Sequence, residues 1–151
     1  MLDALRQGKR AILLEPLRAL ARQMADELEA ILPGLNLIFE IRSNLKISTG
    51  DYRMEDELPF GPPPGGELLV ATPERLEALL RNPANASWFE TVGAVCVDEA
   101  HLISSPRRGP TLEYLLTSLL CLPTPPPGWC YCRQRWVMWS EPRLGWHPAR
   151  W

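Results

Sequence analysis

The chain has 151 residues, a length that suits one domain. Hydrophobic residues make up 46% and charged residues 23% of it, which excludes a fully disordered or fibrous chain. No apolar run approaches the roughly 18 residues of a membrane span, and the N-terminus lacks the features of a secretion signal, so we expect an intracellular, cytoplasmic protein, with the nucleus as an alternative if the source is a eukaryote. The net charge of -2 provides no overall basic field for a polyanionic partner.

The N-terminal third of the chain predicts a helix end, a strand and a long amphipathic helix. Met1–Gln7 suits the last turns of a helix that stops at Gly8. Ala11–Leu14 is a short apolar run of the kind that is buried on both faces of a parallel sheet. Pro16 then opens a helix that ends at Pro33-Gly34. The apolar residues of this helix recur at three- and four-residue steps and form one stripe, made of Leu17, Leu20, Ala21, Met24, Leu28, Ile31 and Leu32.

The middle of the chain predicts further strands and a second helix. Leu35–Ile41 and Leu45–Ser48 are strand material, although the first also fits an insertion or a hairpin. Gly61–Gly66 contains three prolines and three glycines and predicts a loop. Leu68–Ala71 predicts another buried strand, and a helix follows over residues 73–81.

The next segment completes an alternating pattern of strands and helices. Val92–Val97 is a strongly β-prone apolar run that ends at Asp98-Glu99. Leucines at three- and four-residue steps predict a final helix over residues 112–120. Such alternation predicts an α/β fold in which a parallel sheet is flanked by helices.

Residues 123–151 differ in composition from the rest of the chain. Four prolines occupy positions 123–127, and five of the six tryptophans follow them. The tail has four Arg and one Glu (net +3), whereas residues 1–122 have 12 basic and 17 acidic side chains (net -5). A basic, Trp-rich tail suits stacking on single-stranded nucleic acid, but the lack of any clear period favours a disordered or non-native end. We therefore divide the chain into a domain over 1–122 and a Pro/Trp-rich tail over 123–151.

The segment that suggests chemistry is Val92–His101. Ligands of a parallel sheet gather at the carboxyl ends of its strands, where this segment places Asp98 and Glu99. Asp98 can hold Mg²⁺ through its water shell, and Glu99 can orient and deprotonate an attacking water. His101 stands two residues further, where it can sense the phosphate end of a nucleotide. The alternative is that the two acids only cap the next helix.

These residues resemble motif II of the superfamily-two DEAD/DEAH-box helicases, in its DEAH form. Four more segments resemble motifs of the same family in the family's order, and two of the four are typical of its Ski-type branch. The five segments are Glu15–Ala21 (motif Ia), Ser48–Tyr52, Ala71–Arg75 (motif Ib), Asp98–His101 (motif II) and Arg108–Glu113. The ordered set covers residues 1 to about 122.

The resemblance implies the first of two RecA-like domains, a P-loop NTPase fold, with ATP and Mg²⁺ as cofactors. In that family Asp98 and Glu99 would serve magnesium-ATP, and DNA or RNA, single-stranded at the contact, would be the track. The nucleic-acid face would be lined by Pro16, Arg18, Ala19, Thr49, Gly50, Thr72, Pro73 and Glu74. Free N–H groups at the start of a helix suit phosphate, the Arg18 guanidinium adds a charged donor, and Thr72 offers a capping hydroxyl. Contacts of this kind carry little sequence information.

The sequence also departs from the family. The chain has no G-x-x-x-x-G-K-[ST] loop, and Gly8-Lys9 precedes a strand and is no substitute for it. The Ser-Ala-Thr motif III and the second RecA-like domain are missing too. We therefore expect an inactive fragment of a helicase core that lacks the strand carrying the phosphate loop. Without that strand, we expect the Val92–Val97 strand to lack a neighbour. We expect the tail to come from a shifted reading frame or an aberrant join. The alternatives are a non-catalytic module that binds single-stranded nucleic acid and a gene fragment without a function of its own.

Overall fold

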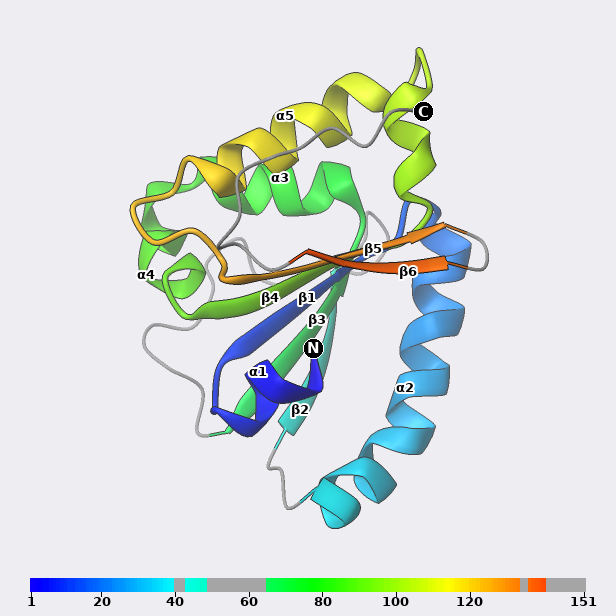
Figure 1. Cartoon of the computed structure of the whole chain (residues 1–151), viewed down its shortest axis with the longest axis vertical. Helices are drawn as coiled ribbons and strands as arrows, with labels where there is room; N and C mark the ends of the chain where they lie inside the picture. Colours follow the sequence, from blue (N-terminus) through cyan, green and yellow to red (C-terminus); the bar gives the residue numbers. More distant parts are fainter. Residues whose placement is uncertain (40–42, 49–64, 134–135, 141–151) are drawn as a thin grey trace.

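A computed structural model describes residues 1–39, 43–48, 65–133 and 136–140 of the chain (Figure 1). The elements in chain order are α1 (Leu2–Arg6), β1 (Arg10–Leu14), α2 (Arg18–Phe39), β2 (Ser43–Ser48), β3 (Gly66–Ala71), α3 (Pro73–Arg81), the 3-10 helix η1 (Pro83–Asn85), α4 (Ala86–Phe89), β4 (Val92–Val97), the 3-10 helix η2 (Ala100–Ser104), α5 (Gly109–Leu120), β5 (Gly128–Arg133) and β6 (Trp136–Ser140). Among these helices, none combines the length and the hydropathy that a bilayer crossing requires.

The strands form one sheet in the order β2-β3-β1-β4-β5-β6. Neighbouring strands from β2 to β5 are parallel, and β6 runs antiparallel to β5. The register pairs Leu14 at the end of β1 with Ala71 of β3 on one side and Val97 of β4 on the other. The predicted α/β fold with a parallel sheet flanked by helices is therefore confirmed.

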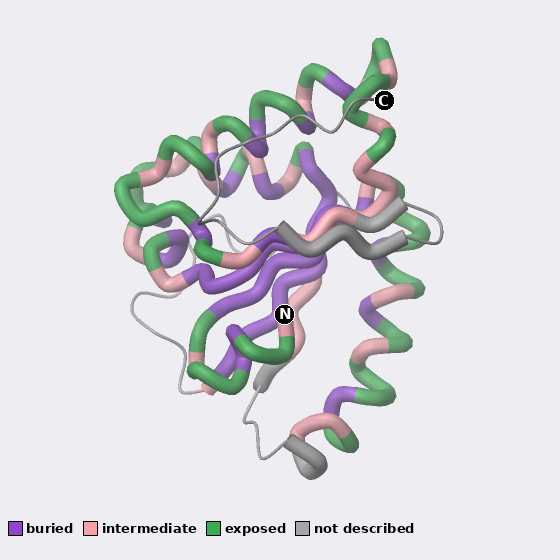
Figure 2. The backbone as a smooth tube through the Cα atoms, viewed as in Figure 1, coloured by how far each residue is buried: buried purple, intermediate pink, exposed green. Residues whose placement is uncertain are grey.

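Helices cover both faces of the sheet, which explains why its central strands are largely apolar (Figures 1 and 2). In β1, Ile12 and Leu14 join the core under α3, α4 and α5, whereas Ala11 and Leu13 join the core under α1 and α2. Because every residue of β1, β3 and β4 is buried, these strands form the rigid centre of the domain.

Gly8 ends the first helix as predicted. Its φ of 69° lies in the left-handed region, which glycine adopts without a steric penalty. The Gly8 N–H donates to the Leu5 carbonyl over 3.0 Å, and the Lys9 N–H donates to the Ala4 carbonyl over 2.9 Å. These bonds satisfy the last carbonyls of α1 and turn the chain directly into β1.

Helix α2 differs from the prediction at both ends. It begins at Arg18, and Pro16 lies in the turn before it, so the prediction that Pro16 opens the helix is wrong. The helix also continues through Pro33 and Gly34 to Phe39, so the predicted stop and the predicted strand over 35–39 are wrong; residues 40 and 41 lie outside the described part. A proline removes one main-chain donor, a local loss that packing of the remaining helix can outweigh.

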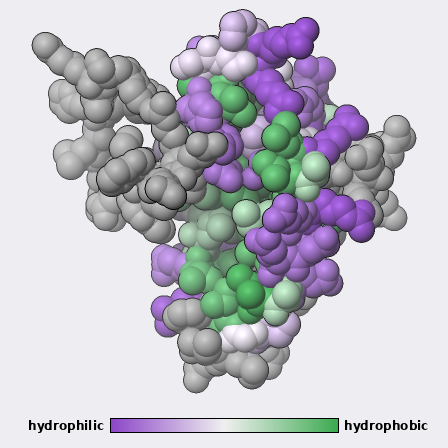
Figure 3. Space-filling model, turned by 90° about the vertical axis from the view of Figure 1, so that its right-hand side faces the viewer, coloured by the Kyte–Doolittle hydropathy of each residue, from purple (hydrophilic) through white to green (hydrophobic). Residues whose placement is uncertain are grey.

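The apolar stripe of α2 is only partly buried. Ala21, Ala25 and Leu32 are buried, whereas Leu17 and Ile31 are exposed. In Figure 3, which looks onto the side of the molecule that carries α2, hydrophobic surface therefore appears between hydrophilic side chains. Met24 and Leu28 are half-buried and pack against the same core as Ala21 and Ala25.

The sheet continues beyond α5, in the segment after the proline run. β5 pairs in parallel with β4, and β6 follows it, within the region where the sequence suggested a strand only for 136–139. Trp129 is buried and its indole Nε1–H donates to the Pro126 carbonyl over 2.9 Å. The expectation that Val92–Val97 lacks a neighbour is wrong, because β1 and β5 flank this strand.

Candidate functional site

The candidate residues that the structure describes lie at the carboxyl ends of the parallel strands. Ser48 ends β2, Thr72 follows β3, Glu15 follows β1 and Asp98 follows β4. Because these strands are neighbours and point the same way, their ends form one continuous edge in the order Ser48, Thr72, Glu15, Asp98. The sheet therefore brings together segments that are up to 83 residues apart in the sequence, as between Glu15 and Asp98.

Glu15 and Asp98 lie side by side at the centre of this edge. The register pairs Leu14 with Val97, and the Asp98 N–H donates to the Leu14 carbonyl over 2.9 Å. Only 1% of Glu15 is exposed, and its Oε1 atom has no hydrogen-bond partner among the described residues. The pKa of Glu15 is raised to about 7, chiefly because the carboxyl group is buried. The charge of Asp98, a hydrogen bond with the Asp98 carboxyl group and the charge of Glu99 raise it further, whereas a hydrogen bond with the Leu17 backbone lowers it.

Glu99 stands in a strained conformation beside this pair. Its φ of 48° and ψ of 38° are left-handed, and it is the one non-glycine residue with positive φ in the described ranges. Asp98 Oδ1 accepts the Glu99 N–H over 2.8 Å, so this oxygen fixes the sharp turn that leaves β4. His101 Nδ1 lies 3.0 Å from Glu99 Oε2. Backbone strain of this kind costs of order 1–3 kcal/mol and is concentrated at active sites and ligand-binding sites.

The edge suits a hydrated divalent cation. Three carboxyl groups, those of Glu15, Asp98 and Glu99, meet there, and their mutual repulsion contributes to the raised pKa of Glu15. A cation offsets such repulsion, and Mg²⁺ needs few carboxylates because it keeps several of its waters. Within the described residues no cluster of three or more His, Cys, Asp or Glu side chains has the geometry of a direct metal site.

The turn after β1 presents the first set of predicted nucleic-acid residues. Pro16 is half-buried in this turn, while Arg18 and Ala19 are exposed in the first turn of α2. The Ala21 N–H donates to the Leu17 carbonyl over 2.8 Å, which starts the helix. The remaining N–H groups of this first turn and the Arg18 guanidinium form the positive end that a phosphate prefers.

The start of α3 contributes differently from expectation. Thr72 and Pro73 are buried, Glu74 is exposed, and the Thr72 hydroxyl makes no capping hydrogen bond. Arg75 instead reaches sideways, and its Nε donates to Ser48 Oγ over 3.1 Å. This bond ties the ends of β2 and β3 together. The predicted residues Thr49 and Gly50 lie outside the described part of the chain.

Several residues of this edge were not predicted as site residues, Glu15 and Arg108 among them. Glu15 was assigned only to a motif, although it follows a buried parallel strand as Asp98 does, and that shared pattern was the available signal. Arg108 was also assigned only to a motif, and its Nη1 donates to the Pro16 carbonyl over 2.9 Å. A contact between residues 92 apart in sequence has no local signal.

Comparison with known proteins decides the family. The DEAD/DEAH box helicase family model matches residues 1–139. The chain belongs to the DEAD/DEAH box helicase family. Its sequence is 36% identical over 116 residues to the ATP-dependent DNA helicase Hel308 of Pyrococcus horikoshii, covering 77% of this chain and 14% of that protein. It is 40% identical over 121 residues to the ATP-dependent DNA helicase Hel308 of Methanocella arvoryzae, covering 79% of this chain and 15% of that protein.

These relatives are much longer than the chain. The chain spans 9% of the ATP-dependent DNA helicase Hel308 of Thermococcus kodakarensis, to which it is 39% identical over 117 residues. The family match and the parallel sheet together identify a partial RecA-like domain of a superfamily-two helicase core. The resemblance drawn from the motifs is thus confirmed.

Proposed function

We propose that this chain supplies the magnesium-facing and nucleic-acid-facing edge of an ATP-dependent helicase core. The observation that supports this most directly is the meeting of Asp98 and Glu99 with the turn that carries Arg18, at one edge of the sheet. The two Hel308 relatives named above are DNA helicases by name, and the proposal extends to DNA or RNA as the track. In this role the protein works inside the cell, in the cytoplasm or the nucleus.

Each acidic residue has a separate task in the proposed reaction. Bound magnesium-ATP supplies the phosphoryl group that is transferred to water. Asp98 holds the hydrated cation, while Glu99, kept in place by the left-handed turn and by His101, orients the water and accepts its proton. Glu15 adds a third carboxyl group behind Asp98, and this buried group limits how far Asp98 can move.

The nucleic-acid contact is proposed at the start of α2. Arg18 faces the solvent and offers a charged donor to a phosphate, and the main-chain N–H groups of the same turn add to it. Contacts to phosphate and sugar would give affinity without sequence preference. In a complete protein, a second RecA-like domain would close over the ATP site, and the contacted strand would be single.

Binding of a fluorescein-labelled single-stranded oligonucleotide, followed by fluorescence anisotropy, tests the nucleic-acid contact. Arg18→Ala should weaken binding about tenfold, which corresponds to about 1.4 kcal/mol. Arg22→Ala is the matched control, because Arg22 is exposed one turn further along α2, where it pairs with Asp26 over 3.9 Å. Equal effects of the two substitutions would contradict a contact located at Arg18.

ATP hydrolysis tests the acidic pair. The chain alone should hydrolyse little ATP, because its sequence contains no G-x-x-x-x-G-K-[ST] loop. A version extended upstream by that loop should show activity that Glu99→Gln removes. If the chain alone hydrolyses ATP and Glu99→Gln abolishes that hydrolysis, the inactive-fragment proposal is refuted. If both versions bind the oligonucleotide but neither hydrolyses ATP, the non-catalytic binding module is favoured. Failure of both versions to fold or bind would favour a fragment without function.

A further inference from the structure

Arg108 joins two segments of the site that lie far apart in the sequence. It is half-buried, it stands just before α5, and its guanidinium donates to the main-chain carbonyl of Pro16 over 2.9 Å. The receiving carbonyl belongs to the turn between β1 and α2. A charged donor aimed at a main-chain carbonyl fixes the backbone, whatever side chains surround it.

The turn that receives this bond lies between the acidic residues and Arg18. At its start, Glu15 donates its N–H to the Ala71 carbonyl over 3.0 Å and packs its carboxyl group against Asp98. At its end, the Leu17 carbonyl begins the hydrogen bonding of α2. Arg108 holds the residue between these two points, so its bond restrains the turn that leads into α2.

The backbone around Arg108 is built for a close approach. Gly109 donates its N–H to the Ser105 carbonyl over 2.8 Å, and a Cβ atom at Gly109 would lie 2.2 Å from the Ile103 carbonyl oxygen. Only glycine fits at that distance. The backbone of η2 and the start of α5 therefore lie in close contact next to Arg108. This contact restricts the directions that the Arg108 side chain can take.

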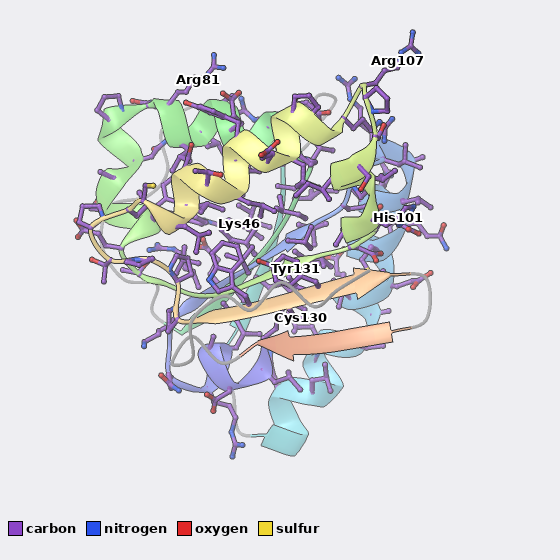
Figure 4. All side chains as sticks on the ribbon, turned by 45° about the horizontal axis from the view of Figure 1, so that its top comes forward. Lys46, Arg81, His101, Arg107, Cys130 and Tyr131 are labelled. Atoms are coloured by element: carbon purple, nitrogen blue, oxygen red, sulfur yellow. The ribbon has the colours of Figure 1, made fainter. Side chains whose placement is uncertain are left out.

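The neighbouring arginine has no such role. Arg107 is exposed, and Figure 4 shows its side chain pointing away from the body of the molecule at the tip of the segment between η2 and α5. The two arginines carry the same charge at nearly the same place. Arg107 thus provides a control in which charge is removed while the bond to Pro16 remains.

We propose that Arg108 is a positioning residue, which holds the turn at Pro16 so that Arg18 meets the nucleic-acid backbone. This inference rests on the proposed function, because it assigns Arg108 a part in nucleic-acid binding without contact to the nucleic acid. It also links the segment that begins at Asp98 and Glu99 to the turn that carries Arg18 through one hydrogen bond.

A double-mutant cycle on the full chain tests the proposal, with anisotropy of the labelled single-stranded oligonucleotide as the readout. Arg108→Ala should weaken binding about fivefold to tenfold, and Arg107→Ala less than twofold. Combined with Arg18→Ala, Arg108→Ala should cause no further loss, because Arg108 acts through Arg18. If the losses of binding free energy in Arg18→Ala and Arg108→Ala are additive, Arg108 contacts the nucleic acid itself. If Arg107→Ala and Arg108→Ala weaken binding equally, only the charge matters. Either result overturns the proposal.

Hydrogen exchange separates failure of this proposal from failure of the proposed function. In Arg108→Ala, the Ala21 amide, which bonds to the Leu17 carbonyl, should exchange about tenfold faster than in Arg107→Ala, while the amides of β4 stay protected. Unchanged exchange at Ala21 overturns the proposal even if the oligonucleotide binds. Faster exchange at Ala21 without any oligonucleotide binding by the unmodified chain supports the positioning role and rejects the nucleic-acid function. Arg108→Lys, which keeps a charged donor, should restore part of the protection.

Discussion

Replacing Glu15 with glutamine should make the protein more stable at alkaline pH than the unmodified chain. The pKa of Glu15 is about 7 in the folded protein and 4.5 in its ordinary state, chiefly because burial and the charge of Asp98 disfavour its carboxylate. A folded pKa above the unfolded one means that the folded state binds the proton more tightly. The contribution of Glu15 to stability is therefore complete below pH 4.5 and is lost as pH rises through 7. The shift corresponds to about 3 kcal/mol.

Urea unfolding followed by tryptophan fluorescence measures this effect, because Trp88 is fully buried. The free energy of unfolding of the unmodified chain, minus that of Glu15→Gln, should fall by about 3 kcal/mol between pH 4.5 and pH 8. Subtraction cancels the titrating groups that do not interact with Glu15, so the difference reports Glu15 together with the coupled Asp98. If the profiles of Glu15→Gln and the unmodified chain run parallel, the carboxyl group of Glu15 is not held as described.

Three further predictions concern the backbone and the core. Gly109→Ala should destabilise the domain by about 1–3 kcal/mol, because the added Cβ atom would meet the Ile103 carbonyl oxygen. Gly34→Ala should stabilise the domain by about 0.5–1 kcal/mol, because Gly34 has open space around it in α2. Urea unfolding compares the two variants, and a smaller loss for Gly109→Ala would contradict the close approach. Glu99→Gly should be about 1 kcal/mol more stable than Glu99→Ala in thermal unfolding, because the position is left-handed, and equal stabilities would contradict that conformation. Arg10→Ala should lower the free energy of unfolding by about 1–3 kcal/mol, because it removes one buried partner of the Glu67 carboxylate, which keeps Lys46 at 2.8 Å and the Trp88 Nε1–H at 3.1 Å. A loss below about 1 kcal/mol would show that the Arg10–Glu67 pair is not structural.

The sequence predicted the centre of the fold better than its periphery. Short apolar runs such as Leu68–Ala71 and Val92–Val97 are strands because burial on both faces leaves no alternative to a covered parallel sheet. The helix stop at Pro33-Gly34 was predicted from local preferences, and those are weaker than packing. β5 was missed because a proline run precedes it, although Trp129 and Tyr131 alternate as strand residues do and stack with ring centroids 6.2 Å apart.

The candidate site divides in the same way. Asp98 and Glu99 were found because motif II stands directly after its strand. The surroundings of Glu15 depend on the register of β1 against β4, and the partner of Arg108 lies 92 residues away, so neither could be read from neighbouring residues. Chemical identity is local in the sequence, but pKa and positioning arise from tertiary contacts.

β1 carries a buried ionisable group at each end of its apolar run. Arg10, at its first position, lies 3.2 Å from Glu67 and faces the Trp88 ring at 5.0 Å, and Glu15 follows its last position. Hydrophobic residues alone would let this strand slide along its neighbours, because every side chain between these two is apolar. A slip of one position would push a charge into hydrocarbon on one side or the other. Arg10 and Glu15 thus favour the native register of β1. The Glu15 carboxyl group, which lies beside Asp98 in the candidate site, also disfavours pairing of the central strand in a shifted register.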